Sequence, residues 1–208
     1  MRANLSWMPA GVLLLIGGCS APPPPEPQGP PAPEFKVTAT LKDIMDSVID
    51  TNADFIWNSV ATTVSAKGVE ERRPQTDDDW KEVRRHTIAL IEGVNLLLIP
   101  GRRVARPGEK SENPDVELPP EKIEALINED RATFQTLAHA LQDSLAPVLD
   151  AVEKKDPEAL LNAGEPIDRA CENCHLKYWY PGQPGFYDQQ PPVAPADSKA
   201  CEKKDAAK

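Results

Sequence analysis

The sequence predicts an all-α protein, an antiparallel four-helix bundle flanked by a disordered proline-rich linker and a disordered C-terminal tail. Apolar residues recur at helical spacing in four separate stretches. Strand signals, such as alternating apolar runs and Asn-Gly turns, are scarce. Roughly 145 residues remain between the two ends, which suits one ordinary domain, expected over 37–180. Four amphipathic helices of these lengths bury their apolar sides most economically as a bundle.

The first two helices are expected in the first half of the chain. One runs from Leu41 to Val64, and its drifting apolar stripe predicts a bend near Asn52. The second begins after Thr76, an N-cap residue followed by three aspartates at the positive helix end, and stops at the Pro-Gly pair 100–101. One face of the first helix is formed by residues three or four apart: Leu41, Met45, Val48 and Asn52.

The other two helices follow a long polar connection. The third begins at the prolines 119–120 and continues past Pro147, where a kink is expected. Asp130 interrupts its apolar stripe, so we expect this carboxylate at an exposed rim of the bundle. The fourth helix opens at Asp156 and extends to Tyr178.

The fourth helix carries the most specific feature of the chain, a C-x-x-C-H motif at 171–175. Residues three and four apart share one face of a helix. The thiols of Cys171 and Cys174 can therefore reach the two vinyl groups of one haem, while the imidazole of His175 reaches its iron from the same side. The motif predicts one covalently bound haem c, with His175 as the proximal iron ligand.

Three other interpretations of the motif are weaker. A thioredoxin-like redox pair belongs in a βαβ setting, which the helical pattern does not provide. A zinc site needs four ligands, and the chain has neither a second C-x-x-C nor paired histidines. A structural disulfide between Cys171 and Cys174 would leave His175 unexplained.

A haem motif on the last helix of a four-helix bundle resembles the cytochrome c′ family, over about Val37 to Tyr180. In that family the motif lies on the fourth helix, whereas the small class I cytochromes c carry it near the N-terminus. The resemblance implies that a residue of the first helix covers the distal side of the iron. A methionine there can ligate the iron, and a leucine or phenylalanine leaves it five-coordinate.

Met45 matches that first-helix position and is the only methionine left once the N-terminal signal is removed. We therefore expect its sulfur to be the distal iron ligand. The alternative is that Met45 only fills the core, as most buried methionines do. Two histidines are weaker candidates: His86 lies at the margin of the second stripe, and His139 lies opposite the stripe of the third and is expected in solvent.

The resemblance also implies smaller features of the site. An aromatic residue follows the haem histidine by three positions, which makes Tyr178 a candidate for packing on the haem. The family has an arginine at the next position, but Trp179 stands here, so the charge near the proximal imidazole differs. Lys42 lies near the position of a basic partner for a haem propionate.

The N-terminus has the form of a bacterial lipoprotein signal at 1–18. A positive start precedes an apolar run too short to span a bilayer, and the run ends in Gly17-Gly18-Cys19, which resembles a lipobox. We expect Cys19 to be lipidated, with two or more acyl chains for stable anchoring. The alternative is a cleaved signal with an incidental cysteine. By the lipoprotein sorting pattern, Ser20 suggests the outer membrane.

The segments outside the haem domain are expected to lack a core. Residues 19–36 are rich in proline, which favours a polyproline II tether of about 3.1 Å per residue. In residues 181–208, apolar side chains do not recur at helical or strand spacing, so this segment is expected to be disordered. Cys201 lies in this tail and has no assigned role.

The charge balance limits the partners. With 23 Lys and Arg against 33 Asp and Glu, the net charge is −10, and no basic run is present to neutralise nucleic-acid phosphates. The single apolar run is terminal, which excludes a multi-span membrane protein. The acidic charge predicts a redox protein partner with a basic docking face.

Together these features predict a membrane-tethered periplasmic monohaem cytochrome that transfers one electron and is not an enzyme. Two alternatives stay open: a five-coordinate cytochrome c′-like protein that binds nitric oxide or carbon monoxide, and an accessory haem subunit of a respiratory complex. The resemblance also implies a possible homodimer.

Overall fold

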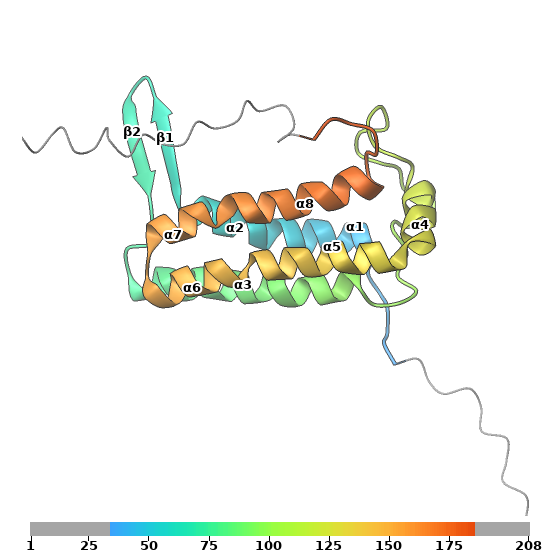
Figure 1. The fold of residues 1–208 in the computed structure, drawn as a ribbon, viewed down its shortest axis with the longest axis horizontal. Helices are drawn as coiled ribbons and strands as arrows, with labels where there is room; N and C mark the ends of the chain where they lie inside the picture. The colour runs from blue at the N-terminus through green and yellow to red at the C-terminus, as the bar shows by residue number, and fades with distance from the viewer. Residues whose placement is uncertain (1–33, 186–208) are drawn as a thin grey trace, which may run out of the picture. The chain divides into compact units, whose positions relative to one another are not determined.

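Four helical segments run antiparallel in the computed structural model, which describes residues 34–185 (Figure 1). The predicted all-α four-helix bundle is confirmed. The first segment comprises α1 (Leu41–Ile44), the π-helical turn η1 (Met45–Ile49) and α2 (Asp50–Ser59). The second is α3 (Asp77–Leu97), the third is α5 (Arg131–Ser144) with α6 (Ala146–Lys154), and the fourth is α7 (Pro157–Asn162) with α8 (Gly164–Tyr178).

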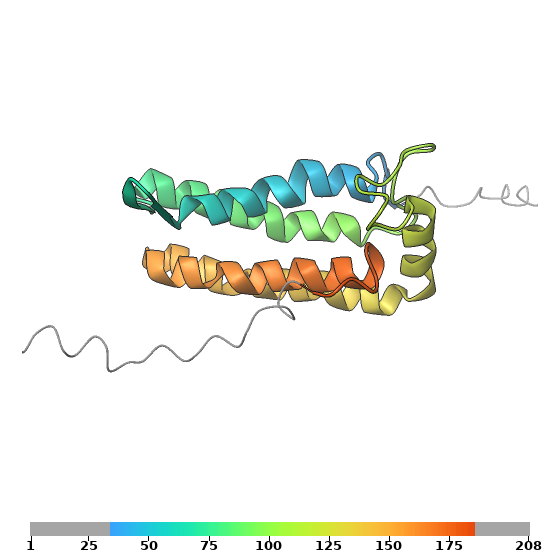
Figure 2. The ribbon, with the colours of Figure 1, turned by 90° about the horizontal axis from the view of Figure 1, so that it is seen from above.

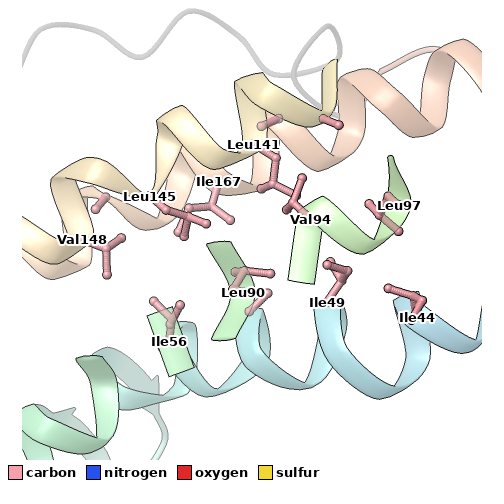
Figure 3. Close-up of a cluster of buried hydrophobic side chains, with 14 of the residues drawn as sticks. Ile44, Ile49, Ile56, Leu90, Val94, Leu97, Leu141, Leu145, Val148 and Ile167 are labelled. Carbon is pink, nitrogen blue, oxygen red and sulfur yellow. The ribbon is translucent and has the colours of Figure 1, made fainter. Parts of the chain in front are cut away.

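The core lies along the middle of the bundle, where apolar side chains of all four segments point toward one another (Figure 3). Leu90, Leu145 and Ile167 are fully buried there. The period of 3.6 residues per turn explains why one stripe of each helix supplies these residues. The side chains labelled in the figure are Ile44, Ile49, Ile56, Leu90, Val94, Leu97, Leu141, Leu145, Val148 and Ile167.

Two helix starts are fixed by capping boxes. As predicted, Thr76 caps α3: its hydroxyl accepts the N–H of Asp79 at 3.2 Å, and the Asp79 carboxylate accepts the N–H of Thr76 at 2.8 Å. Thr40 and Asp43 form the same reciprocal pair at the start of α1. Each box satisfies N–H groups that a helix start otherwise leaves unpaired.

The prediction that the first helix continues to Val64 is wrong, because a β-hairpin begins after α2. Strand β1 (Ala61–Ser65) pairs antiparallel with β2 (Gly68–Arg72), and Val64 lies opposite Val69. The β-branched residues of β1 favour a strand, and the turn is completed by Gly68 at a φ of 127°, which glycine adopts without strain. The hairpin projects from the end of the bundle opposite α4 (Pro120–Glu129) (Figures 1 and 2).

The third predicted helix is also interrupted. Helix α4 lies across one end of the bundle, and the chain turns at Asp130 before α5 begins (Figures 1 and 2). Asp130 is the N-cap of α5, since its carboxylate accepts the N–H of Thr133 at 3.1 Å. Its half-exposed side chain lies at the rim, as expected. The predicted kink near Pro147 is confirmed, because α5 ends at Ser144 and α6 begins at Ala146.

Several predictions concern segments that the structure does not describe. The signal peptide, Cys19, most of the proline-rich tether and Cys201 lie outside residues 34–185. Over those described residues, none of the helices combines the length and apolar character that a bilayer span requires.

Candidate functional site

Helix α8 presents the C-x-x-C-H motif as one half-buried patch. The helix is regular from Gly164 to Tyr178, so Cys171, Cys174 and His175 lie on the same side. Its rotation is fixed by Tyr178, which is fully buried and meets the ring of Phe134 edge-on at 5.6 Å.

A hollow opens beside this patch and consists of two neighbouring cavities of about 180 and about 190 Å³. Met45, Asp50 and His175 line both cavities, so the two adjoin at these residues. The second cavity is bordered by both motif cysteines and by an apolar wall that includes Ile49, Ala53, Leu97, Phe134, Leu137 and Leu141. The first is more polar and reaches Lys42, Lys110, Glu112 and Glu117.

Burial sets the protonation of the motif. It raises the pKa of the Cys171 and Cys174 thiols to about 12, and for Cys171 the nearby carboxylates of Asp168 and Asp50 add to the effect. A thioredoxin-like nucleophile requires the opposite shift. Burial also lowers the pKa of His175, which favours the neutral imidazole. Within residues 34–185, no three His, Cys, Asp or Glu side chains are grouped so that they could hold a metal ion.

The structure brings Met45 to the same hollow as His175. Met45 is the first residue of η1 in the first segment, and it is half-buried against the core. A thioether and an imidazole from two different helices therefore line one space.

Lys42 and Tyr178 are placed differently from the motif residues. Lys42 lines the polar cavity, but its Nζ lies 3.4 Å from Oε1 of both Glu109 and Glu112, so carboxylates of the protein already surround it. Tyr178 lines neither cavity, and its hydroxyl donates to the carbonyl of Asp130 at 3.1 Å. The structure thus brings Lys42 to the hollow and keeps Tyr178 in the bundle core.

The two alternative histidines lie away from the hollow. The ring of His86 stacks on Phe55 at 3.8 Å, and its Nδ1 lies 2.7 Å from Oδ1 of Asn52. His139 is exposed and its Nδ1 lies 2.8 Å from Oε1 of Gln142. Neither residue lines either cavity.

Aromatic residues beyond the motif also line the hollow, whereas Asp50, which lines both cavities, was missed by sequence reasoning. Trp179 and Tyr180 lie four and five positions after His175, and their rings lie 5.8 and 5.9 Å from that of His175. The Tyr180 hydroxyl donates to Glu172 at 2.7 Å, which fixes the ring. Asp50 was not predicted, because an ordinary α-helix would place it off the face of Met45.

No family model and no curated protein matches the chain. The chain is similar to solved structures of cytochrome c prime from Alcaligenes xylosoxidans. A nitric oxide complex of a leucine-to-valine variant is 17% identical, with a TM-score of 0.43, covering 69% of this chain and 98% of that one. A ferrous arginine-to-glutamine variant is 20% identical, with a TM-score of 0.42, covering 68% and 98%.

Proposed function

We propose that this protein is a monohaem c-type cytochrome that transfers one electron through a haem held in the hollow. The observation that carries the proposal is the convergence of four side chains on one space. Cys171, Cys174 and His175 reach it from α8, and Met45 reaches it from the first segment. Nothing in this arrangement calls for an organic substrate, so we propose electron transfer and not enzymatic catalysis.

The residues present fit a haem of the c type. Two thiols one helical turn apart border an apolar cavity, and an imidazole lies one residue further on the same helix. The apolar wall suits a flat, largely apolar group. In the more polar cavity, Lys42 and Lys110 are the cations available to the carboxylates of such a group, beside several acidic side chains. When bound, a haem supplies an iron that alternates between Fe(III) and Fe(II).

Each side chain then has a distinct task. Cys171 and Cys174 hold the group through thioether bonds, and His175 presents a neutral imidazole to the metal. Met45 presents a soft sulfur, which favours the reduced state and so raises the potential. Leu97, Leu137 and Leu141 in the wall exclude water from the site. We propose that Lys42 pairs with a haem carboxylate in competition with Glu109 and Glu112.

An optical spectrum and a mass of the mature protein, made in cells that attach haem c, test the proposal. We expect a mass increase of one haem that survives denaturation, and a far-red sulfur-to-iron band in the oxidised form. Met45→Leu conserves volume but removes the sulfur, so it should abolish the band and retain the covalent haem. A colourless mature protein contradicts the proposal.

The same spectra decide between Met45 ligation and the five-coordinate alternative. A high-spin spectrum that is unchanged in Met45→Leu and Met45→Ala contradicts ligation by Met45. Fast binding of carbon monoxide or nitric oxide to the reduced wild type would then favour the gas-binding function. Slow or absent binding supports electron transfer.

We also propose that the protein is held at a bacterial membrane, on the periplasmic side of the outer membrane, by lipid on Cys19. The lipobox-like sequence supports this location. The mature N-terminus should begin at Cys19 and carry the mass of its acyl chains, and Cys19→Ser should lose both. A soluble wild-type protein without lipid contradicts the tether.

The proposed partner is a redox protein with a basic docking face, supported by the net charge of −10. The rate of electron exchange should therefore fall as ionic strength rises, and a flat dependence contradicts this. Co-purification in detergent with a respiratory complex would instead favour an accessory subunit. Sedimentation of the mature protein tests the possible homodimer.

A further inference from the structure

The first helical segment contains a π-helical turn directly at Met45. In η1 the N–H of Asp50 donates to the carbonyl of Met45, five residues back, where an α-helix would use four. Such turns are rare and often lie at functional sites. Here the turn separates residues that α-helical spacing would place on one face: Met45 lines the hollow, whereas Val48 and Asn52 contact α3.

Asn52 holds the turn from inside the bundle. Its side chain is buried, and Nδ2 donates to the carbonyl of Val48 at 2.6 Å. Because Nδ2 is the donor in that bond, Oδ1 is an acceptor, and it lies 2.7 Å from Nδ1 of His86. The His86 ring therefore carries its proton on Nδ1 and donates it to Asn52.

His86 is itself held in place. Its ring stacks on Phe55 with an interplanar angle of 13°. It lies on α3, so the bond to Asn52 joins the first segment to the second. Rotation of either side chain would break the hydrogen bond between His86 and Asn52. The buried Oδ1 of Asn52 would then lack a donor, which lowers the stability of the fold.

Gly93 makes room for the turn on the same side. It follows His86 by two turns of α3, and a Cβ at this position would lie 2.6 Å from Cγ1 of Val48. Such a distance is too short for two carbon atoms. The absence of a side chain at Gly93 thus allows α3 to approach η1 closely.

We propose that Asn52, His86 and Gly93 are positioning residues that hold the π turn against α3 and thereby aim Met45 into the hollow. The consequence for iron ligation rests on the proposed function. A relaxation of η1 to a regular α-helix would rotate the preceding residues by roughly 100°, the angle of one residue. The Met45 side chain would then no longer point into the hollow that His175 lines.

The test uses the full mature haem-loaded protein and two measurements: hydrogen exchange at the Asp50 amide and the far-red sulfur-to-iron band. Asn52→Leu removes both side-chain bonds at similar volume. We expect the turn to fluctuate between the π and α registers, so that the Asp50 amide opens more often and exchanges roughly tenfold faster, and the band to weaken. His86→Leu should act in the same direction, whereas His139→Leu, at an exposed histidine on α5, should change neither measurement.

Gly93→Ala provides a milder variant in case Asn52→Leu does not fold. Its methyl group should displace Val48 and weaken the band. Unchanged exchange in Asn52→Leu, or an unchanged band and exchange in Gly93→Ala, overturns the proposal. If the wild type carries no haem, the proposed function fails, and the exchange of Asp50 still decides whether these residues hold the turn.

Discussion

Helix α8 and the first helical segment both bring side chains to the hollow, but they position them by different means. In α8 the spacing of Cys171, Cys174 and His175 along a regular helix is enough to place all three together. In the first segment, Met45 lies at a π turn whose geometry depends on contacts with α3, through Asn52 and Gly93.

The geometry of a site can therefore be set by local helix spacing, as in α8, or by contacts between helices, as in the first segment. A motif on a regular helix keeps its geometry wherever that helix folds. A single residue at an irregular turn keeps its geometry only while neighbouring helices hold the turn. We therefore expect substitutions at His86 and Gly93, the α3 residues beside the turn, to affect Met45 and to leave the covalent attachment at α8 unchanged.

The largest expected effect comes from removing the local motif. Cys171→Ser combined with Cys174→Ser should abolish covalent haem, because no other thiol among residues 34–185 borders the hollow. Mass spectrometry of the denatured mature protein should show polypeptide and lipid alone. Cys201→Ser is the matched control and should retain the full haem mass. Covalent haem in the double variant would show that the motif is not the attachment site.

A smaller effect is expected from the packing that holds α8. Ile167 is fully buried, so Ile167→Ala should lower the free energy of unfolding by about 2–5 kcal/mol through lost burial and a new cavity. Leu161, on α7 and 46% exposed, is the control, and Leu161→Ala should change stability by less than about 0.5 kcal/mol. Denaturant unfolding measures both.

The optical spectrum of Ile167→Ala tests whether α8 places its motif by local helix spacing alone. The folded fraction of this variant should still attach haem and show the sulfur-to-iron band, since Ile167 lines neither cavity. If the folded variant lost the sulfur-to-iron band, α8 would also depend on tertiary packing to place His175. The two helices would then position their side chains by the same means.

The sequence was sufficient where one local rule dominates. The helix start at Thr76 follows from a capping box, and the break near Pro147 follows from proline geometry. The four-helix arrangement follows from apolar stripes. At the candidate site, the shared face of Cys171, Cys174 and His175 needs only the helical period.

The sequence was insufficient where tertiary contacts choose between similar local states. A π turn at Met45 differs from an α turn by one hydrogen-bond register. A bend was expected near Asn52, and the irregularity of the first segment is the π turn at Met45–Ile49. The hairpin after Ser59 was missed because β-branched residues also fit a helical stripe. Asp50 lines the hollow and directly follows the π turn, which α-helical spacing from Met45 does not predict.

The smallest expected effect compares the two capping boxes. Hydrogen bonds from Thr40 hold the pKa of Asp43 below its ordinary value, and those from Gln75 and Thr76 do the same for Asp79. A lowered folded-state pKa means that each carboxylate stabilises the fold above the ordinary aspartate pKa of 3.8, and that this contribution is lost as pH falls through the folded-state pKa.

Asp43→Asn and Asp79→Asn should therefore both be less stable than the wild type at pH 7, and the difference should shrink in acid. Thermal unfolding across pH measures this. Only Asp43→Asn should also weaken the sulfur-to-iron band, because Asp43 starts the helix that leads directly into η1, whereas Asp79 starts α3. Equal effects of the two variants on the band would mean that the helix start beside Met45 contributes nothing to its position, and that the contacts with α3 are sufficient to set it.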